Sequence, residues 1–112
     1  MNVTSSGLRV LDIQLIHNAL RQYPRVTEAI LYGSRAKGNY RPGSDIDLTL
    51  RGDQLSHNDL LDIEQSLDDL LLPYKIDLSL LDQIDNPELL KHIERVGQSF
   101  YLNTAGSRQV AG

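Results

Sequence analysis

Three short stretches of the chain carry the apolar pattern of β-strands. From Asp45 to Leu50 and again from Lys75 to Leu80, apolar and polar residues alternate, which predicts strands because successive strand side chains point to opposite faces. The third stretch is Val26 to Tyr32, and the Asp45 strand ends at Gly52-Asp53. The turn residues Asn39 to Gly43 join the first two strands of the chain. A connection this short favours antiparallel pairing, since a parallel crossover needs about a dozen residues or more.

Three longer stretches repeat apolar residues every three or four positions, which is typical of amphipathic helices. They run from Gly7 to Gln22, from Ser56 to Pro73 and from Asn86 to Gly97. The second opens with a capping box formed by Ser56 and Asp59, and the third opens with Asn-Pro-Glu. The apolar positions of the three helices are Leu8, Leu11, Leu15, Ile16, Ala19 and Leu20, then Leu60, Ile63, Leu67, Leu70 and Leu71, and finally Leu89, Ile93 and Val96.

Together these elements predict an α/β (α+β) fold in the order αβαβα, with a small mixed sheet of three to four strands packed with about three to four helices. Phe100 to Leu102 can add an edge strand or pack as coil. A chain of 112 residues is long enough for one modest core, so we expect a single domain over residues 1–103. Residues 104–112 are small and polar and predict a disordered tail.

The candidate chemistry begins with aspartates on the predicted strands. Asp45 and Asp47 share one face of their strand, and Asp77 lies in matching phase on the Lys75 to Leu80 strand. If the two strands are neighbours, the three carboxylates meet on one polar face. At a few ångströms two carboxylates repel by roughly 4 kcal/mol at an effective dielectric near 20, so such a cluster needs a cation or a raised pKa. A hard divalent ion such as Mg²⁺ fits oxygen ligands of this kind.

A phosphate cradle is expected beside the carboxylates, because Mg²⁺ binds through one or two carboxylates together with substrate phosphates. Gly33 and Ser34 follow the Val26 to Tyr32 strand directly. Gly33 allows close approach of the backbone to a ligand, and a short helix opening at Ser34 would direct its positive end at an anion. Lys37 adds positive charge, while Arg35 can either contact phosphate or merely be a solvated charge at the turn.

The histidine and tyrosine residues are weaker candidates for the site. His17, His57 and His92 lie on three different predicted helices without the spacing of metal ligands, which favours surface or helix-end roles. Tyr32 is expected in the core. Tyr40, in the loop, is the better candidate for a nucleotide contact.

The motif formed by Gly33-Ser34, ten further residues and Asp45-Ile46-Asp47 resembles the signature of the DNA polymerase beta-like nucleotidyltransferase superfamily. The sequence Gly-Ser-Arg-Ala-Lys-Gly is most similar to its minimal nucleotidyltransferase (MNT) branch. The resemblance runs from about Val26 to Leu80, and more loosely to Tyr101. It implies the minimal nucleotidyltransferase fold. The site residues that it implies are Asp45, Asp47 and Asp77 as catalytic and metal-binding carboxylates, and Gly33, Ser34, Arg35 and Lys37 for the nucleotide. Lys37 stands where many relatives carry arginine, which keeps the charge but weakens bidentate phosphate contact.

The resemblance also implies a function, because MNT proteins are commonly antitoxins of HEPN-domain ribonuclease toxins. By this likeness the chain is a Mg²⁺-dependent enzyme that transfers AMP from ATP to a hydroxyl, a tyrosine of the HEPN toxin, within a hetero-oligomer. One alternative is an antitoxin that neutralises the toxin by binding alone. Another is a transferase acting on a small molecule, although relatives of that kind use additional structure to enclose the acceptor.

Composition narrows the partners further. The formal net charge of −4 opposes a broad nucleic-acid surface, which would be basic, so we expect no direct nucleic-acid substrate. The chain has no cysteine, hence no disulfide and no thiolate zinc site, which suits a reducing compartment. No apolar run approaches 20 residues, so we expect no membrane span and a cytoplasmic location.

Overall fold

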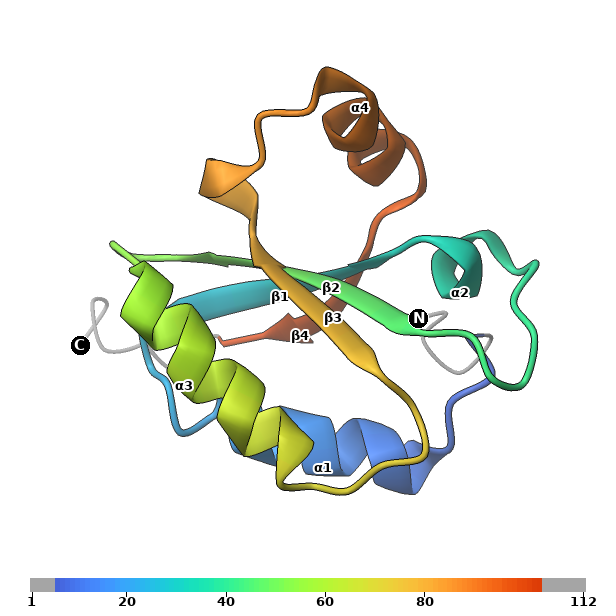
Figure 1. Ribbon diagram of the computed structural model, residues 1–112, viewed down its shortest axis with the longest axis horizontal. Coiled ribbons are helices and arrows are strands. Elements are labelled where there is room, and N and C mark those ends of the chain that lie inside the picture. Colours follow the sequence, from blue (N-terminus) through green and yellow to red (C-terminus); the bar gives the residue numbers. More distant parts are fainter. Residues whose placement is uncertain (1–5, 104–112) are drawn as a thin grey trace.

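In the computed structural model, which describes residues 6–103, one four-stranded sheet lies between two sets of helices (Figure 1). The strands are β1 (Val26–Tyr32), β2 (Ile46–Gly52), β3 (Ile76–Leu80) and β4 (Gln98–Leu102), arranged in the order β3-β2-β1-β4. β1 pairs antiparallel with both β2 and β4, whereas β2 and β3 are parallel. The mixed sheet, the antiparallel first pair and an edge strand at the C-terminal end are therefore confirmed.

The helices divide between the two faces of the sheet. α1 (Val10–Leu20) and α3 (His57–Asp68) cover one face, while the short 3-10 helix η2 (Leu81–Gln83) and α4 (Pro87–Val96) lie over the other (Figure 1). The four-residue α2 (Ser34–Lys37) follows β1. The expected αβαβα order holds for the first five elements, and β3, η2, α4 and β4 then follow. None of the helices within residues 6–103 combines the length and apolar character that crossing a membrane requires.

The core lies between the sheet and the α1/α3 layer. Burying one aliphatic side chain there contributes about 1.5–3 kcal/mol to folding. The aliphatic residues that form it include Leu8, Ile13, Ile16, Leu20, Val26, Ala29, Leu31, Ile46, Leu48, Leu50, Ile63, Leu67, Leu78 and Leu80. Because strand side chains alternate, burying these residues directs the polar residues of β2 and β3 to the opposite face, which bears the candidate site.

Two helix predictions need correction. The first helix begins at Val10 rather than Gly7, and Leu11 is 57% exposed, since the buried stripe runs through Ile13 instead. The second ends at Asp68, well before Pro73. Leu71 adopts a positive φ of 55° and is 88% exposed, so it belongs to the turn toward β3 and not to the helix face. The tail expected over residues 104–112 lies outside the described residues.

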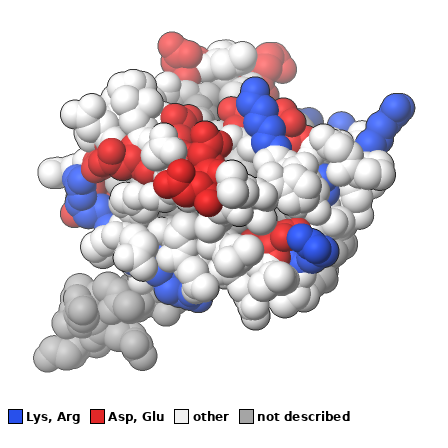
Figure 2. Space-filling model, turned by 60° about the horizontal axis from the view of Figure 1, so that its bottom comes forward, with Lys and Arg blue, Asp and Glu red and all other residues white. Residues whose placement is uncertain are grey.

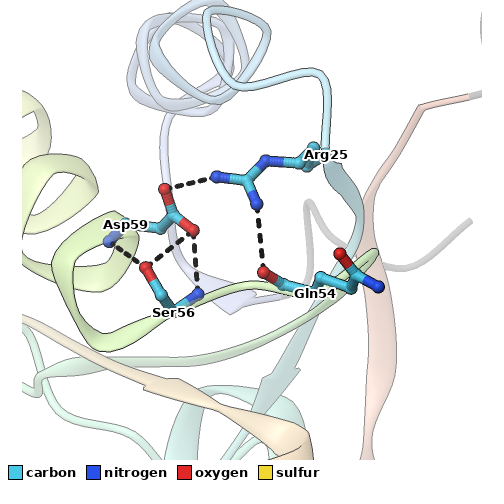
Figure 3. Close-up of polar contacts among 4 residues, drawn as sticks. All are labelled: Arg25, Gln54, Ser56 and Asp59. Atoms are coloured by element: carbon cyan, nitrogen blue, oxygen red, sulfur yellow. Dashed lines mark hydrogen bonds and ion pairs between the residues drawn. The ribbon is translucent and has the colours of Figure 1, made fainter.

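The N-terminus of α3 is fixed by the predicted capping box (Figure 3). The Asp59 N–H donates to Ser56 Oγ at 3.1 Å, and the Ser56 N–H donates to the Asp59 carboxylate at 2.8 Å. Arg25, just before β1, donates to the same carboxylate at 2.6 Å and to the Gln54 carbonyl at 3.0 Å. Hydrogen bonds from Ser56 and the charge of Arg25 lower the pKa of Asp59. These contacts orient the crossover helix that brings β3 alongside β2.

Acidic side chains gather over α3 on the face of the molecule shown in Figure 2. α3 carries Asp59, Asp62, Glu64 and Asp68, and no lysine or arginine occurs between Gly52 and Tyr74. A negative surface of this kind repels phosphate backbones.

Candidate active site

Two of the predicted carboxylates lie side by side on neighbouring strands. Asp47 of β2 and Asp77 of β3 are direct partners in the parallel register. Two positions further along the same polar face, Ser79 Oγ donates to Thr49 Oγ1 at 2.9 Å. Asp45 is exposed and lies one residue before β2. The structure therefore brings Asp77 to Asp47, as the phase of the two strands predicted.

Asp47 has a carboxyl group with a raised pKa. Its side chain is partly buried, and burial, followed by the negative charges of Asp77 and Asp45, raises the pKa of Asp47 to about 6. The ionised carboxylate is thus destabilised at neutral pH. A bound cation would relieve both the burial and the repulsion.

Gly33 packs its backbone directly against the Asp47 carboxylate. Its φ of 75° lies in the left-handed region that favours glycine. A Cβ at this position would lie 2.1 Å from Asp47 Oδ2, so the turn and the carboxylate can be this close only with glycine here. α2 begins at Ser34, as predicted, and the Lys37 N–H donates to the Gly33 carbonyl at 3.0 Å. The two pieces of the sequence motif therefore meet in space.

Tyr32 extends the row of side chains to a third strand. It is the register partner of Asp47 across β1 and β2, so Tyr32, Asp47 and Asp77 occupy adjacent positions. Tyr32 is buried, and this burial is the main cause that raises the pKa of its hydroxyl. The charges of the nearby aspartates raise it further, whereas a hydrogen bond with Ser79 acts in the opposite direction. The phenol is therefore neutral at physiological pH. Tyr32 is buried, as expected, but on the sheet face opposite the α1/α3 core.

Arg35 takes a structural position rather than a phosphate-facing one. It is only 2% exposed, and the hydrogen-bond donors of its guanidinium are directed at backbone. They donate to three carbonyl oxygens. The distances are 2.8 Å to Ser6 and 3.3 Å to Pro42, and the Ser44 carbonyl accepts from both Nη2, at 2.9 Å, and Nε, at 3.1 Å. The sequence left open whether Arg35 contacts phosphate or is a solvated charge at the turn. In the structure its guanidinium joins the N-terminal segment to the loop before β2, and a role at the nucleotide site stays a prediction.

Tyr40 belongs to the same structural cluster. The Arg35 guanidinium lies 5.1 Å from the centre of the Tyr40 ring and 4.9 Å from that of Tyr74. A Cβ added to Gly7 would also collide with the Tyr40 ring, at 2.4 Å. Tyr40 therefore packs against Arg35 and the N-terminal segment, and this packing does not support the nucleotide contact expected for it.

The remaining nucleotide-site candidates lie on α2. Ser34 is partly buried at the first position of the helix, directly after Gly33. Lys37 is exposed at the last position. Both residues belong to the short helix that begins directly after Gly33, whose backbone lies against the Asp47 carboxylate. Both stay candidates for phosphate contact.

His92 is a site residue that the sequence patterns missed. It is partly buried on α4, and its Nε2 accepts a hydrogen bond from the Gly33 N–H at 3.0 Å. Its ring also meets Tyr32 edge-on, with centroids 6.1 Å apart. The expected surface role of His92 is therefore wrong. The one available signal was its place beside Ile93, on the side of the helix that faces the sheet.

The other two histidines lie away from the carboxylates. His17 Nε2 is 2.7 Å from the Phe100 carbonyl oxygen, and burial lowers the pKa of this imidazole. His57 is exposed at the first turn of α3, where a surface role was expected.

The carboxylates fit a magnesium ion that is shared with a substrate. Within residues 6–103, no group of three or more His, Asp or Glu side chains is already arranged around a single ion position. Mg²⁺ in nucleotide enzymes, however, usually needs only one or two carboxylates and takes its other oxygens from phosphates and water. Asp47 and Asp77 supply such a pair, with Asp45 close enough for its charge to act on Asp47.

Among the solved structures that share this fold are three with toxin-antitoxin proteins. The first is a toxin-antitoxin complex with AMP-PNP, with a TM-score of 0.66 and 23% identity over 88% of this chain and 80% of that chain. The second is a tri-AMPylated HEPN toxin of Shewanella oneidensis in complex with an MNT antitoxin, with a TM-score of 0.62 and 21% identity over 90% and 78% of the two chains. The third is the toxin-antitoxin MntA-HepT, with a TM-score of 0.62 and 21% identity over 92% and 80%.

Comparison at the level of sequence families gives the same fold. No curated protein sequence matches the chain. Residues 14–105 match the family described as "Polymerase beta, Nucleotidyltransferase", and this segment includes Gly33, Asp45, Asp47 and Asp77. The match covers most of the chain and contains every element from β1 to β4. The chain therefore belongs to the polymerase beta nucleotidyltransferase family.

Proposed function

We propose that this protein is an antitoxin that uses Mg²⁺ and ATP to transfer AMP to a hydroxyl of a cognate HEPN toxin, with tyrosine as the acceptor. The observation that carries the proposal is the Asp47 and Asp77 pair, with the Gly33 backbone packed against Asp47. Support comes also from the similar structures, since one holds AMP-PNP and another contains an AMPylated HEPN toxin beside an MNT antitoxin.

Each site residue has a role in this reaction. Asp45, Asp47 and Asp77 would hold Mg²⁺, which when bound neutralises charge on the triphosphate and lowers the pKa of the acceptor hydroxyl. Ser34 and Lys37 would contact the phosphates, and Gly33 allows the backbone to approach them.

The transfer itself exchanges one phosphorus–oxygen bond for another. The acceptor oxygen bonds to the α-phosphorus of ATP, the bond from that phosphorus to the bridging oxygen breaks, and pyrophosphate leaves with the electron pair. The acceptor proton passes to a carboxylate. Asp77 is suited to this step because it is exposed on an edge strand, where a protein acceptor can reach it.

Exposure of the site favours a large acceptor. Asp45 and Asp77 are both exposed, so the carboxylates open to the surface. A small acceptor would need an enclosing wall to be oriented for attack, whereas a protein brings its own surface to complete the cleft. This observation supports a protein acceptor over a small molecule.

Intact-mass measurement of a co-expressed HEPN partner tests the proposal. With wild-type protein, the partner should gain about 329 Da for each modified hydroxyl, from the chemistry of adenylyl transfer. The Asp45→Asn, Asp47→Asn and Asp77→Asn variants should leave the mass unchanged while the complex still forms, and Asp62→Asn on exposed α3 should behave as wild type. If the partner is neutralised by the wild-type protein but stays unmodified with ATP and Mg²⁺, the protein is an antitoxin that acts by binding alone.

A further inference from the structure

α4 contacts the Gly33 turn through the side chain of His92. The helix is well defined at both ends, because the Asn86 side chain accepts from the Glu88 and Leu89 N–H groups and Gly97 follows its last residue. Ile93 anchors it to the sheet face. His92 precedes Ile93 and points from this anchored helix toward the end of β1, where its imidazole meets Gly33.

The contact defines the state of the imidazole. Because the donor is the Gly33 backbone N–H, His92 Nε2 must carry a lone pair, so the neutral ring has its proton on Nδ1. The edge-to-face contact with Tyr32, at an interplanar angle of 79°, holds the ring in this orientation. Two contacts, one polar and one aromatic, thus hold His92 against the end of β1.

The two backbone polar groups of Gly33 are held by different parts of the chain. Gly33 adopts φ 75° and ψ −156°, in the region that is open to glycine. Its carbonyl accepts hydrogen bonds from the Ala36 and Lys37 N–H groups of α2, at 3.2 Å and 3.0 Å, whereas its N–H donates to His92. The Gly33 N–H belongs to the peptide that joins Tyr32, the partner of Asp47 in the sheet, to the turn. Holding this N–H therefore fixes the direction in which the chain leaves β1.

We propose that His92 is a positioning residue of the nucleotide site: its hydrogen bond keeps the Gly33 backbone against the Asp47 carboxylate, and so keeps the turn in the shape that receives the triphosphate. The inference rests on the proposed function and adds a residue to it. It also gives α4 a role in the site, because this helix lies over the sheet face opposite α1 and α3 (Figure 1) and carries His92 to the Gly33 turn.

Two substitutions separate the hydrogen bond from the packing of the ring. His92→Phe keeps an aromatic edge for Tyr32 but removes the acceptor, whereas His92→Gln keeps an acceptor oxygen at a similar reach. We expect His92→Phe to weaken binding of Mg²⁺ and a non-hydrolysable ATP analogue by between about two- and tenfold, and His92→Gln to restore much of this affinity. His57→Phe, on the exposed start of α3, is the matched control and should bind as wild type. His92→Ala gives the same comparison if the larger ring disturbs packing.

A ligand-free measurement reports on the contact itself. Hydrogen exchange of the Gly33 amide, followed by NMR, should be slow in the wild-type protein, faster in His92→Phe and slow again in His92→Gln. Wild-type affinity and slow Gly33 exchange in both His92→Phe and His92→Ala would overturn the positioning role and leave the proposed function standing. A wild-type protein that does not bind the analogue with Mg²⁺ would instead overturn the proposed function, and the inference with it.

Discussion

Asp47 and Asp77 are direct partners in the parallel pairing of β2 and β3, so their carboxylates leave the same face of the sheet at adjacent positions. Adjacent strands are about 4.8 Å apart, and a shift of one residue would place an apolar side chain of β3 beside Asp47. The register is held by the aliphatic residues of both strands, which are buried on the opposite face. The same alternation that builds the core therefore builds the carboxylate pair.

Replacing Asp47 should stabilise the metal-free protein at neutral and alkaline pH. The pKa of Asp47 is raised from 3.8 to about 6, so between these values the native protein holds a proton that the unfolded chain releases. Stability therefore falls as the pH rises through this window, and the loss is complete above it. With a chelator at pH 8, we expect Asp47→Asn to raise the free energy of unfolding by on the order of 1–2 kcal/mol, because solvent screens part of the repulsion.

The gain should be largely lost near pH 4, where native Asp47 is protonated and the unfolded carboxyl, with its pKa of 3.8, is roughly half protonated. Urea unfolding at pH 4 and pH 8 measures the difference, and Asp62→Asn, which removes an exposed charge from α3, should show little of it. If Asp47→Asn is less stable than wild type at pH 8, the carboxylate has a structural partner and its place in a metal site is wrong.

Gly33 should be required for nucleotide binding more than for folding. In Gly33→Ala the new methyl group would lie 2.1 Å from Asp47 Oδ2, so the carboxylate must move. Gly38→Ala is the matched control, because Gly38 also has a positive φ, of 91°, but a Cβ there has nothing within 4 Å. Both variants should lose about 1–2 kcal/mol of stability to backbone strain.

Only Gly33→Ala should also lose affinity for the ATP analogue with Mg²⁺, by about tenfold or more, because one misplaced carboxylate disrupts both metal and phosphate binding. Titration of the two variants side by side gives the answer. Equal affinities in the two would separate the Gly33 turn from the phosphate site.

Arg35 and Lys37 should differ in what they support, although they are two residues apart on α2. Arg35→Lys removes the planar fork that reaches the carbonyls of Ser6 and Ser44, and should destabilise the protein by about 2–4 kcal/mol. Lys37→Met changes an exposed residue, so it should leave stability nearly unchanged and weaken analogue binding. Thermal melting and titration well below the melting point measure the two effects. An Arg35→Lys variant of normal stability but reduced affinity would return Arg35 to the phosphate site.

Much of the fold was predictable because it depends on local patterns. β1 has the predicted bounds, and the alternation within β3 predicted that Asp77 would share a face with Asp47 if the two strands were neighbours, as they are. The capping box of α3 is likewise a short-range feature, with both of its residues within one turn. Such features are encoded by neighbouring residues, and a single sequence contains them in full.

What could not be predicted depends on contacts between distant segments. His92 and Gly33 are 59 residues apart, and the partner of the imidazole is a backbone N–H, which no residue type marks. Arg35 binds carbonyl oxygens, for which the same is true. Leu11 and Ile13 both fit a helical stripe, and only the packing of α1 on the sheet decides that Ile13 is buried.

The most direct test of the account is the Mg²⁺ dependence of nucleotide binding at the Asp47 and Asp77 pair. Calorimetric titration with a non-hydrolysable ATP analogue should show weak binding with a chelator and at least about tenfold tighter binding with Mg²⁺, because the ion joins an acidic site to an acidic ligand. Asp47→Asn and Asp77→Asn should each abolish the gain from Mg²⁺, while Asp62→Asn keeps it. Equal affinity with and without Mg²⁺, or an Asp77→Asn variant that keeps the full gain, would contradict the assignment of this pair as the nucleotide centre.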